Sequence, residues 1–290
     1  YAPVCRAETL RTLFSEATAQ GWSISALDIR NAYVTSPLPE PVYMQPPDGG
    51  YTDKNGTFIS YRQAGKCMRL KKSLYGLKSS GRNFFNFLDD HLRNNGFQSR
   101  DDIDPCLYKH NKLPIFICSY VDDCMIFADP KYMQQAKDVI TKKFEVRQHD
   151  FPAHFLGVDL KKNTAGTKPA TTISLTATTQ IDRLMKRHSI PEKVITTPLP
   201  ESPLRDLDLA DSKPDPTKFR SMVGSISFIA NACRPDCAHA AHSLARKLNA
   251  PSHADMRAAI RTCQYLHTTR LIGITYSGGQ THAAEGAADA

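Results

Sequence analysis

Apolar residues are spaced along this chain in two ways, one typical of β-strands and the other of helices. Two runs rich in Ile, Phe and Val, 115–119 and 124–128, flank the short segment Tyr120-Val121-Asp122-Asp123. Runs of this composition around a polar tip predict a β-hairpin. Shorter runs predict a hairpin insert at 51–65 and strands at 22–28, 42–44, 106–109, 154–160, 172–176 and 271–276.

Helices are predicted where apolar residues recur three or four positions apart. In the segment 6–20 the apolar residues share one face, and Gly21 provides a stop. The same spacing predicts further helices at 82–95, 130–144, 177–188, 217–231, 236–249 and 253–267. The mixture of separate strand and helix segments favours an α+β protein.

A stretch rich in proline and acidic residues interrupts this pattern at 191–216. Such a composition predicts a linker between domains. Residues 1–190 are therefore expected to form one domain and the helical residues 217–276 another, with a tail of small residues at 277–290.

Charge and cysteine content narrow the choice of partners and of compartment. The chain has 37 basic and 29 acidic side chains, a net charge of +8, which favours a polyanionic partner. Its eight cysteines are scattered and form no disulfide framework, so a reducing compartment is expected. No apolar run approaches 18 residues, so no membrane span is predicted. The chain begins without Met and is expected to be a piece of a longer protein.

Three acidic residues end predicted strands. Asp28 follows the strand at 22–28, and Asp122 and Asp123 lie at the tip of the hairpin. Each has an ordinary alternative explanation, because Asp is common in turns and at helix starts. A sheet can nevertheless bring these strand ends together, and three carboxylates at one edge suit Mg²⁺, with Mn²⁺ as the alternative ion. Two such ions about 4 Å apart can support transfer of a nucleotide to a 3′-hydroxyl.

The most basic segment of the chain, 66–82, contains six Lys and Arg residues and no acid. Leu, Tyr and Gly are interleaved with these cations, so the segment is expected to be ordered and to offer its cations to phosphates. The alternative is a solvated basic face. The cations in question are Lys66, Arg69, Lys71, Lys72, Lys78 and Arg82. Together with the three acids, they predict nucleotidyl transfer onto a nucleic-acid primer.

A series of short blocks resembles, in order, the reverse transcriptases of Ty1/copia-type retrotransposons. The hairpin segment Tyr120-Val121-Asp122-Asp123 resembles their catalytic box. The other blocks lie at 27–33, 42–47, 70–78, 155–158, 219–225 and 234–236. The resemblance implies a right-hand polymerase fold: partial fingers and a palm with an antiparallel sheet and catalytic hairpin in 1–190, and a helical thumb or connection in 217–276. It also implies RNA-directed DNA synthesis from an RNA template, a DNA primer and dNTPs.

The resemblance further implies roles for individual residues. Asp28, Asp122 and Asp123 would hold the metal ions. Tyr33 would be the steric gate that excludes ribonucleotides, and Tyr120 would lie under the primer end.

Two further segments receive roles in the same way. Gly76, with Lys78 and Arg82 nearby, would line the incoming nucleotide and the template. The primer strand would be held by Phe155, Leu156 and Gly157. Gly157 also predicts a bend or a close backbone approach within its strand.

The sequence departs from the family pattern at several points. Ser79-Ser80-Gly81 replaces the usual Gln-Ser-Pro, Phe84 replaces a frequent Trp, and Tyr33 replaces the more usual Phe. The family's upstream fingers block would precede Tyr1. Its ribonuclease H would follow residue 276, with Asp289 as a lone first carboxylate. The isolated chain is therefore expected to be weakly active or inactive, and to belong to a polyprotein with integrase and ribonuclease H. The expected location is the cytoplasm, in a virus-like particle, or the nucleus.

Two alternatives to a reverse transcriptase remain open. A catalytically silent remnant would bind nucleic acid through its basic groove without synthesis. An RNA-dependent RNA polymerase would prefer rNTPs, and Tyr33 argues against this alternative.

A group of residues close in the sequence suggests a zinc site: Cys233, Cys237, His239 and His242. A zinc site is nevertheless not expected, because Cys237 and His239 would point apart on a helix and the spacing matches no common zinc finger.

Overall fold

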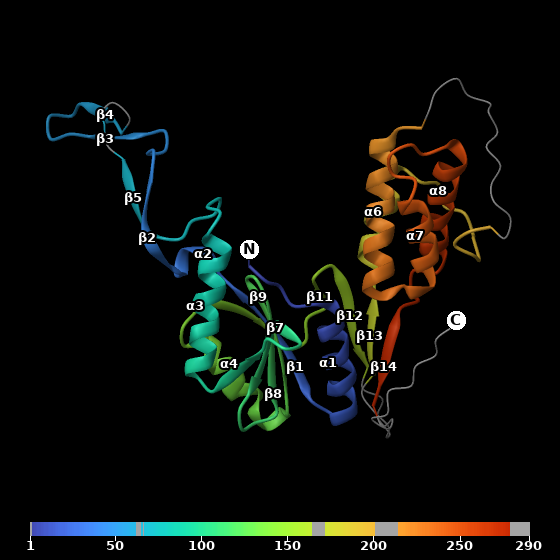
Figure 1. The fold of residues 1–290 in the computed structure, drawn as a ribbon, viewed down its shortest axis with the longest axis horizontal. Helices are drawn as coiled ribbons and strands as arrows, with labels where there is room; N and C mark the ends of the chain where they lie inside the picture. Colours follow the sequence, from blue (N-terminus) through green and yellow to red (C-terminus); the bar gives the residue numbers. More distant parts are fainter. Residues whose placement is uncertain (1, 62–64, 66, 164–171, 201–213, 279–290) are drawn as a thin grey trace. The chain divides into compact units, whose positions relative to one another are not determined.

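The computed structural model describes residues 2–61, 65, 67–163, 172–200 and 214–278, which form helices and antiparallel sheets (Figure 1). The chain divides into two compact units. The first comprises Tyr1–Leu13 and Trp22–Phe151, and the second comprises Phe14–Gly21 and Pro152–Ala290. Helix α1 (Ala7–Gln20) begins in the first unit and ends in the second.

A six-stranded antiparallel sheet organises the first unit, in the order β10-β1-β9-β8-β7-β6. Its strands are β1 (Ser23–Ile29), β6 (Phe97–Arg100), β7 (Asp104–His110), β8 (Ile115–Tyr120), β9 (Asp123–Ala128) and β10 (Val146–His149). Strands β8 and β9 form the predicted hairpin, and β9 also pairs with β1. The sheet therefore joins the two segments that carry the candidate acids.

Two helices supply the other half of the core in this unit. Helix α3 (Ser80–Asn94) carries Phe84, Leu88 and Leu92 at four-residue intervals, so all three side chains lie on one face and are buried. They pack in one cluster with buried residues of the sheet such as Leu27, together with side chains of α4 (Met133–Thr141). A short 3₁₀ turn (Pro130–Tyr132) precedes α4. The predicted helices at 82–95 and 130–144 are confirmed with these adjusted ends.

Two small ladders extend from the sheet unit. Strand β2 (Pro37–Met44) pairs with β5 (Met68–Lys72), and β3 (Gly50–Thr52) pairs with β4 (Phe58–Ser60). The β3–β4 hairpin is closed by Asp53, whose carboxylate accepts hydrogen bonds from the backbone N–H groups of Asn55 and Thr57 at 2.9 and 2.8 Å. The expected hairpin insert is therefore present. A single helical turn, α2 (Ala32–Thr35), lies between β1 and β2.

The second unit combines a four-stranded antiparallel sheet with a group of helices. The sheet has the order β11 (His154–Phe155), β12 (Val158–Asn163), β13 (Thr172–Thr176) and β14 (Ile274–Ser277). The helices are α5 (Thr178–His188), α6 (Pro216–Cys233), α7 (Ala238–Ala245) and α8 (His253–Thr268). A capping box between Ser252 and Asp255 begins α8.

A buried arginine links the C-terminal ends of α6 and α8 by hydrogen bonds. The Arg234 side chain is 0% exposed, and its Nε and Nη2 donate to the two carboxylate oxygens of Asp236 at 2.9 and 2.7 Å. Nη1 donates to the Thr269 carbonyl at 3.1 Å, and Nη2 donates also to the Thr269 hydroxyl at 2.7 Å. The Tyr265 hydroxyl donates to Asp236 Oδ2 at 2.8 Å. The guanidinium is thus compensated in charge and in hydrogen bonding.

The structure corrects the predictions in three places. The expected strand at 154–160 is a hairpin, in which Leu156 and Gly157 form a two-residue loop with positive φ at both positions, the pattern of a type I′ turn. Strands β6 and β10 were not predicted. The two units divide after Phe151 and not at 191–216, because β13 pairs with β14 and draws residues 152–190 into the C-terminal unit. Residues 201–213 of the expected linker, and 279–290 of the expected ribonuclease H start, lie outside the described residues.

Replacing Asp104 with Asn is expected to destabilise the first unit by about 2 kcal/mol, because the buried carboxylate accepts three hydrogen bonds. Its oxygens accept from the Arg6 N–H, the Thr9 hydroxyl and the Cys106 N–H at 2.8, 2.8 and 2.9 Å. Burial alone would raise the pKa of Asp104, but these bonds lower it. The wild-type advantage should therefore be present above about pH 4 and be lost as the pH falls through the lowered pKa. Urea unfolding at several pH values measures this.

The matched control for Asp104 is Asp90→Asn on the exposed face of α3. It removes the same charge without removing a buried acceptor, so its unfolding midpoint should stay near wild type. Equal effects of the two substitutions would contradict the assignment of stability to the buried hydrogen bonds.

Candidate active site

The three acids predicted from the sequence meet at one end of the six-stranded sheet. Asp28 of β1 lies directly opposite Asp123 of β9 in the antiparallel register. Asp122 lies in the adjoining turn, and its carbonyl accepts a hydrogen bond from the Ile29 N–H at 2.8 Å. The sheet therefore places the two segments side by side, as the sequence predicts.

The turn between β8 and β9 has a strained backbone. It consists of Val121 and Asp122, between the paired residues Tyr120 and Asp123. Val121 has a φ of 53°, a conformation that is unusual for a β-branched residue. Glycine normally occupies the first central position of a hairpin turn in which only that residue has positive φ. Strain of this kind persists only where the surrounding structure fixes it, and it is concentrated at functional sites.

The acids repel one another in the folded chain. The pKa of Asp122 is raised by burial and by the negative charge of Asp28. The pKa of Asp123 is raised by burial, then by Asp28 and by Asp122. In the part of the chain that the structure describes, the buried Oδ1 of Asp122 has no hydrogen-bond partner. A bound cation would relieve the repulsion and satisfy this oxygen.

The donor set fits a hard divalent ion held in an open site. Within the described ranges, no group of three or more His, Cys, Asp and Glu side chains lies close enough together to hold a metal ion by itself. Mg²⁺ does not require one, because it usually keeps several waters and binds one or two carboxylates together with substrate phosphates. Asp28, Asp122 and Asp123 are the residues that could hold it here.

A pair of tyrosines lies next to the acids. Tyr33 of α2 contacts Tyr75 with ring centroids 4.8 Å apart, and its ring edge contacts Phe84 of α3 at 6.3 Å. The pKa of Tyr75 is raised by partial burial, then by Asp122, Tyr33 and Asp28, which places its hydroxyl in the field of the acids. Tyr75 is nevertheless 51% exposed, so it is open to a ligand.

The loop that carries Tyr75 is held in place at both ends. The Ser73 N–H donates to the Ser36 carbonyl at 3.0 Å, next to α2. The Ser80 hydroxyl donates to the Leu74 carbonyl at 2.6 Å, at the start of α3. Gly76 follows with a φ of 96° and open space where a side chain would project. The sequence predicts a role for Gly76 but none for Tyr75. The signal was present in the same block, as an aromatic residue within a basic segment.

The basic residues predicted to contact phosphates occupy two elements. Arg69, Lys71 and Lys72 are exposed on β5. Lys78 lies in the turn before α3, and Arg82, within α3, lies over the Phe85 ring at 5.5 Å from its centroid. Lys66 lies outside the described residues.

The remaining predicted residues divide between the two units. Tyr120 pairs with Asp123 in the first unit, so it adjoins the acids. Phe155, Leu156 and Gly157 belong to the β11–β12 hairpin of the second unit, where Phe155 is buried and the other two form the loop.

Two cysteines of the group that suggested a zinc site are core residues. Cys233 and Cys237 are buried, and burial raises their pKa values to about 11 and about 12. Of the eight cysteines in the chain, seven are buried and Cys67 is exposed.

Comparison with known proteins identifies the family of the chain. The profile of the family described as "Reverse transcriptase (RNA-dependent DNA polymerase)" matches residues 1–198, more than half of the chain. The chain belongs to this reverse transcriptase family. Asp28, Asp122 and Asp123 of this reverse transcriptase chain lie within the matched residues.

Curated relatives cover the remainder of the reverse transcriptase chain. It is 29% identical over 293 residues to the retrovirus-related Pol polyprotein from transposon RE1 of Arabidopsis thaliana, a match that covers 100% of this chain and 19% of that protein. It is 28% identical over 258 residues to the putative transposon Ty5-1 protein of Saccharomyces cerevisiae, covering 87% and 79%. The resemblance to Ty1/copia-type Pol polyproteins is therefore confirmed. The chain spans about a fifth of the length of the Arabidopsis polyproteins that it matches.

No described helix has both the length and the apolar content needed to cross a membrane.

Proposed function

We propose that this chain is the RNA-directed DNA polymerase of a Ty1/copia-type Pol polyprotein, and that Asp28, Asp122 and Asp123 are its metal ligands. The observation that supports this most strongly is the register of the sheet, which pairs Asp28 with Asp123. Next to this pair lies the buried Oδ1 of Asp122, which has no hydrogen-bond partner among the described residues. Two divalent ions, when bound, would activate the primer 3′-hydroxyl and stabilise the leaving pyrophosphate.

The other residues of the site suit the handling of a nucleotide and a primer. Tyr33 is fixed between Tyr75 and Phe84, so its ring can exclude a 2′-hydroxyl. The exposed cations of β5 can neutralise phosphates of the template or the incoming dNTP. In this proposal, the six-stranded sheet is the palm, the β2–β5 and β3–β4 ladders belong to the fingers, and α6–α8 form the thumb or connection of a right-hand polymerase.

Primer extension tests the proposed activity. The substrate is oligo(dT) annealed to poly(rA), with dTTP and Mg²⁺ or Mn²⁺, and the enzyme is the polyprotein that carries this chain with its natural neighbours. We expect ion-dependent extension. Salt-dependent binding of the substrate without any extension would contradict the proposal and leave a nucleic-acid-binding protein.

Replacing Tyr33 with Val is expected to raise the ratio of rNTP to dNTP incorporation by roughly tenfold or more, because a smaller side chain no longer excludes the 2′-hydroxyl. Competitive incorporation of UTP and dTTP measures this ratio. Tyr33→Phe is the matched control, since it keeps the ring and should keep the wild-type ratio. An unchanged ratio in Tyr33→Val would remove the steric role from this residue, and a wild-type preference for rNTPs would indicate an RNA polymerase.

A further inference from the structure

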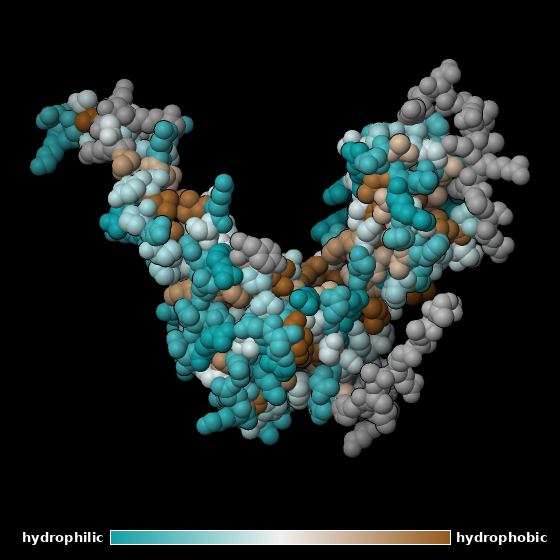
Figure 2. Space-filling view, viewed as in Figure 1, coloured by the Kyte–Doolittle hydropathy of each residue, from teal (hydrophilic) through white to brown (hydrophobic). Residues whose placement is uncertain are grey.

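A proline-rich segment, 191–200, follows α5 and forms neither helix nor strand. Side chains of α8 bind its backbone at two points. Gln264 donates to the Pro191 carbonyl at 2.9 Å, and Thr262 donates to the Pro198 carbonyl at 3.1 Å. Most of the residues between these points are exposed, and hydrophilic residues are frequent on the visible surface of the helical part of this unit (Figure 2). The segment therefore has a fixed course that another protein can reach.

One hydroxyl group of this segment faces an arginine that has a donor to spare. Thr197 is exposed, and its Oγ1 accepts a hydrogen bond from Nη2 of Arg261 of α8 at 2.8 Å. The Nε of Arg261 is buried and has no hydrogen-bond partner among the described residues. Nε and Nη2 form one edge of the guanidinium group, and Arg234 uses the same two atoms to bind both carboxylate oxygens of Asp236. Arg261 therefore offers the same fork with one half unpaired.

A phosphate group on Thr197 would suit this fork. It carries nearly two negative charges and three acceptor oxygens, and Arg binds such a group through two parallel hydrogen bonds. Within the described ranges Arg261 forms no ion pair, so its charge is available to an anion. Residues 193–200 contain no acid that would repel the phosphate. Charge and donor geometry therefore both favour phosphothreonine at this position.

The sequence around Thr197 is one that a protein kinase can read. Proline-directed kinases phosphorylate a Ser or Thr that directly precedes a proline, and the residue before a proline favours the extended backbone in which kinases bind their substrates. Three residues of the chain meet this requirement: Ser36, Thr197 and Ser202. Ser36 is 0% exposed, and Ser202 lies outside the described residues. Of the two that the structure describes, Thr197 is thus the accessible one.

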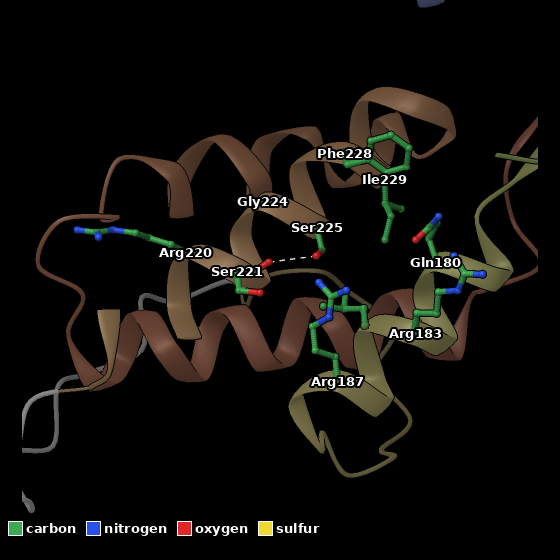
Figure 3. A pocket seen from close by; sticks show the side chains of 10 residues that line it. Gln180, Arg183, Arg187, Arg220, Ser221, Gly224, Ser225, Phe228 and Ile229 are labelled. Carbon is green, nitrogen blue, oxygen red and sulfur yellow. Dashed lines mark hydrogen bonds between the residues drawn. The ribbon is translucent and has the colours of Figure 1, made fainter. Parts of the chain in front are cut away.

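An arginine close to a hydroxyl group is not sufficient for such a site. Figure 3 shows Arg187 of α5 extending towards Ser221 and Ser225 of α6. The Ser225 hydroxyl donates to the Ser221 carbonyl at 3.0 Å within the helix, and neither serine precedes a proline. Helical backbone cannot enter a kinase as an extended strand. Thr197 differs because it combines exposure, a following proline and an arginine with an unpaired donor.

We propose that Thr197 is a phosphorylation site for a proline-directed protein kinase and that Arg261 binds the phosphate through Nε and Nη2. The kinase transfers the γ-phosphoryl group of ATP: a bond forms between Thr197 Oγ1 and the γ-phosphorus, and the bond from that phosphorus to the bridging oxygen of ADP breaks. ADP leaves, and the hydroxyl proton passes to the catalytic base of the kinase. The phosphate then fixes the segment more firmly on α8. This holds whether or not the chain synthesises DNA.

Phosphorylation in solution tests the site. The wild-type chain and Thr197→Ala are incubated with ATP and a proline-directed kinase of the mitogen-activated class, and mass spectrometry locates the phosphate. We expect phosphate on Thr197 of the wild type and a phosphopeptide missing at this position from Thr197→Ala. A folded wild-type chain in which Thr197 stays unmodified would overturn the proposal.

Hydrogen exchange tests the role of Arg261. Phosphorylation should slow amide exchange in the peptide 191–200 by about tenfold, because a hydrogen-bonded phosphate–arginine pair opposes local opening. The variant R261Q should accept the phosphate but show no such slowing.

The matched control is R183Q, which removes an arginine that lines the groove between α5 and α6 instead (Figure 3). It should keep the full slowing after phosphorylation. Equal slowing in phosphorylated R261Q and wild type, or no slowing in the wild type, would show that Arg261 does not bind the phosphate. Circular dichroism of the unmodified variants checks that each is folded, so that a change in exchange reports the phosphate contact.

Discussion

Replacing Asp122 with Asn should reduce DNA synthesis by about 10³-fold while making the folded protein more stable. The activity falls because the variant lacks one of the three carboxylates proposed to hold the ions. The stability rises because the ionised Asp122 is partly buried and faces Asp28, and because its buried Oδ1 has no hydrogen-bond partner among the described residues. Removing a functional but unfavourable charge commonly gains about 1 kcal/mol.

The pH dependence of this stability gain has a definite sign. The folded-state pKa of Asp122 is raised, so its ionised form opposes folding. Wild-type stability should therefore decrease as the pH rises from about 4, the unfolded value, through the raised folded value. The gain from Asp122→Asn should be present at neutral pH and vanish near pH 4. Thermal unfolding across this range measures it, alongside primer extension.

Addition of Mg²⁺ separates the two effects. The ion should raise the melting temperature of the wild type, because it binds the folded chain, and should raise that of Asp122→Asn much less. Asp90→Asn serves again as the control and should resemble the wild type in both assays. If Asp122→Asn kept full synthesis, or melted below the wild type at neutral pH, the three acids would not form the proposed metal site.

Replacing Asp236 with Ala is expected to destabilise the second unit by about 3–5 kcal/mol, the largest stability effect that we predict for a single substitution. The guanidinium of Arg234 would lose two hydrogen bonds and its counter-charge while it stays buried. Tyr265 would also lose its acceptor. For a unit of this size, the melting temperature should fall by roughly 10 °C.

Unfolding monitored by circular dichroism measures this loss, and Asp182→Asn is the control, because its ion pair with Arg270 is exposed and long. That control should cost less than about 1 kcal/mol. Burial would raise the pKa of Asp236, but Arg234 and Tyr265 lower it. The stability it provides should therefore persist above about pH 4 and be lost only as the pH falls through the lowered value. A loss below about 1 kcal/mol in Asp236→Ala would show that the buried arginine has other compensation.

The acids and the hairpin could be predicted because their strands are buried on both faces, which gives long apolar runs. Strands β6 and β10 could not be predicted, because each lies at an edge of the sheet and pairs with one neighbour only. An edge strand needs few apolar residues, so it leaves no apolar run in the sequence. In β10, Val146 is followed by Arg147, Gln148 and His149, a composition that resembles a loop. Yet β10 pairs with β1 beside Asp28.

The division into units depends on pairing between distant segments, which a local pattern does not reveal. Strand β14 begins at Ile274, far along the chain from its partner β13. Local composition therefore indicated the proline-rich segment as the boundary, whereas the sheet sets it near Phe151. Tyr75 was missed for a related reason, because its position next to Tyr33 and the acids arises only when the loop is held between α2 and α3.

The difference in exposure among the thiols allows one cysteine of this protein to be labelled selectively. A maleimide dye added to the folded chain should modify Cys67 and spare the seven buried cysteines. Cys67 immediately precedes the basic strand β5. The emission of that single dye would then test, in real time and with no mutation introduced, the proposed binding of RNA or DNA at this strand.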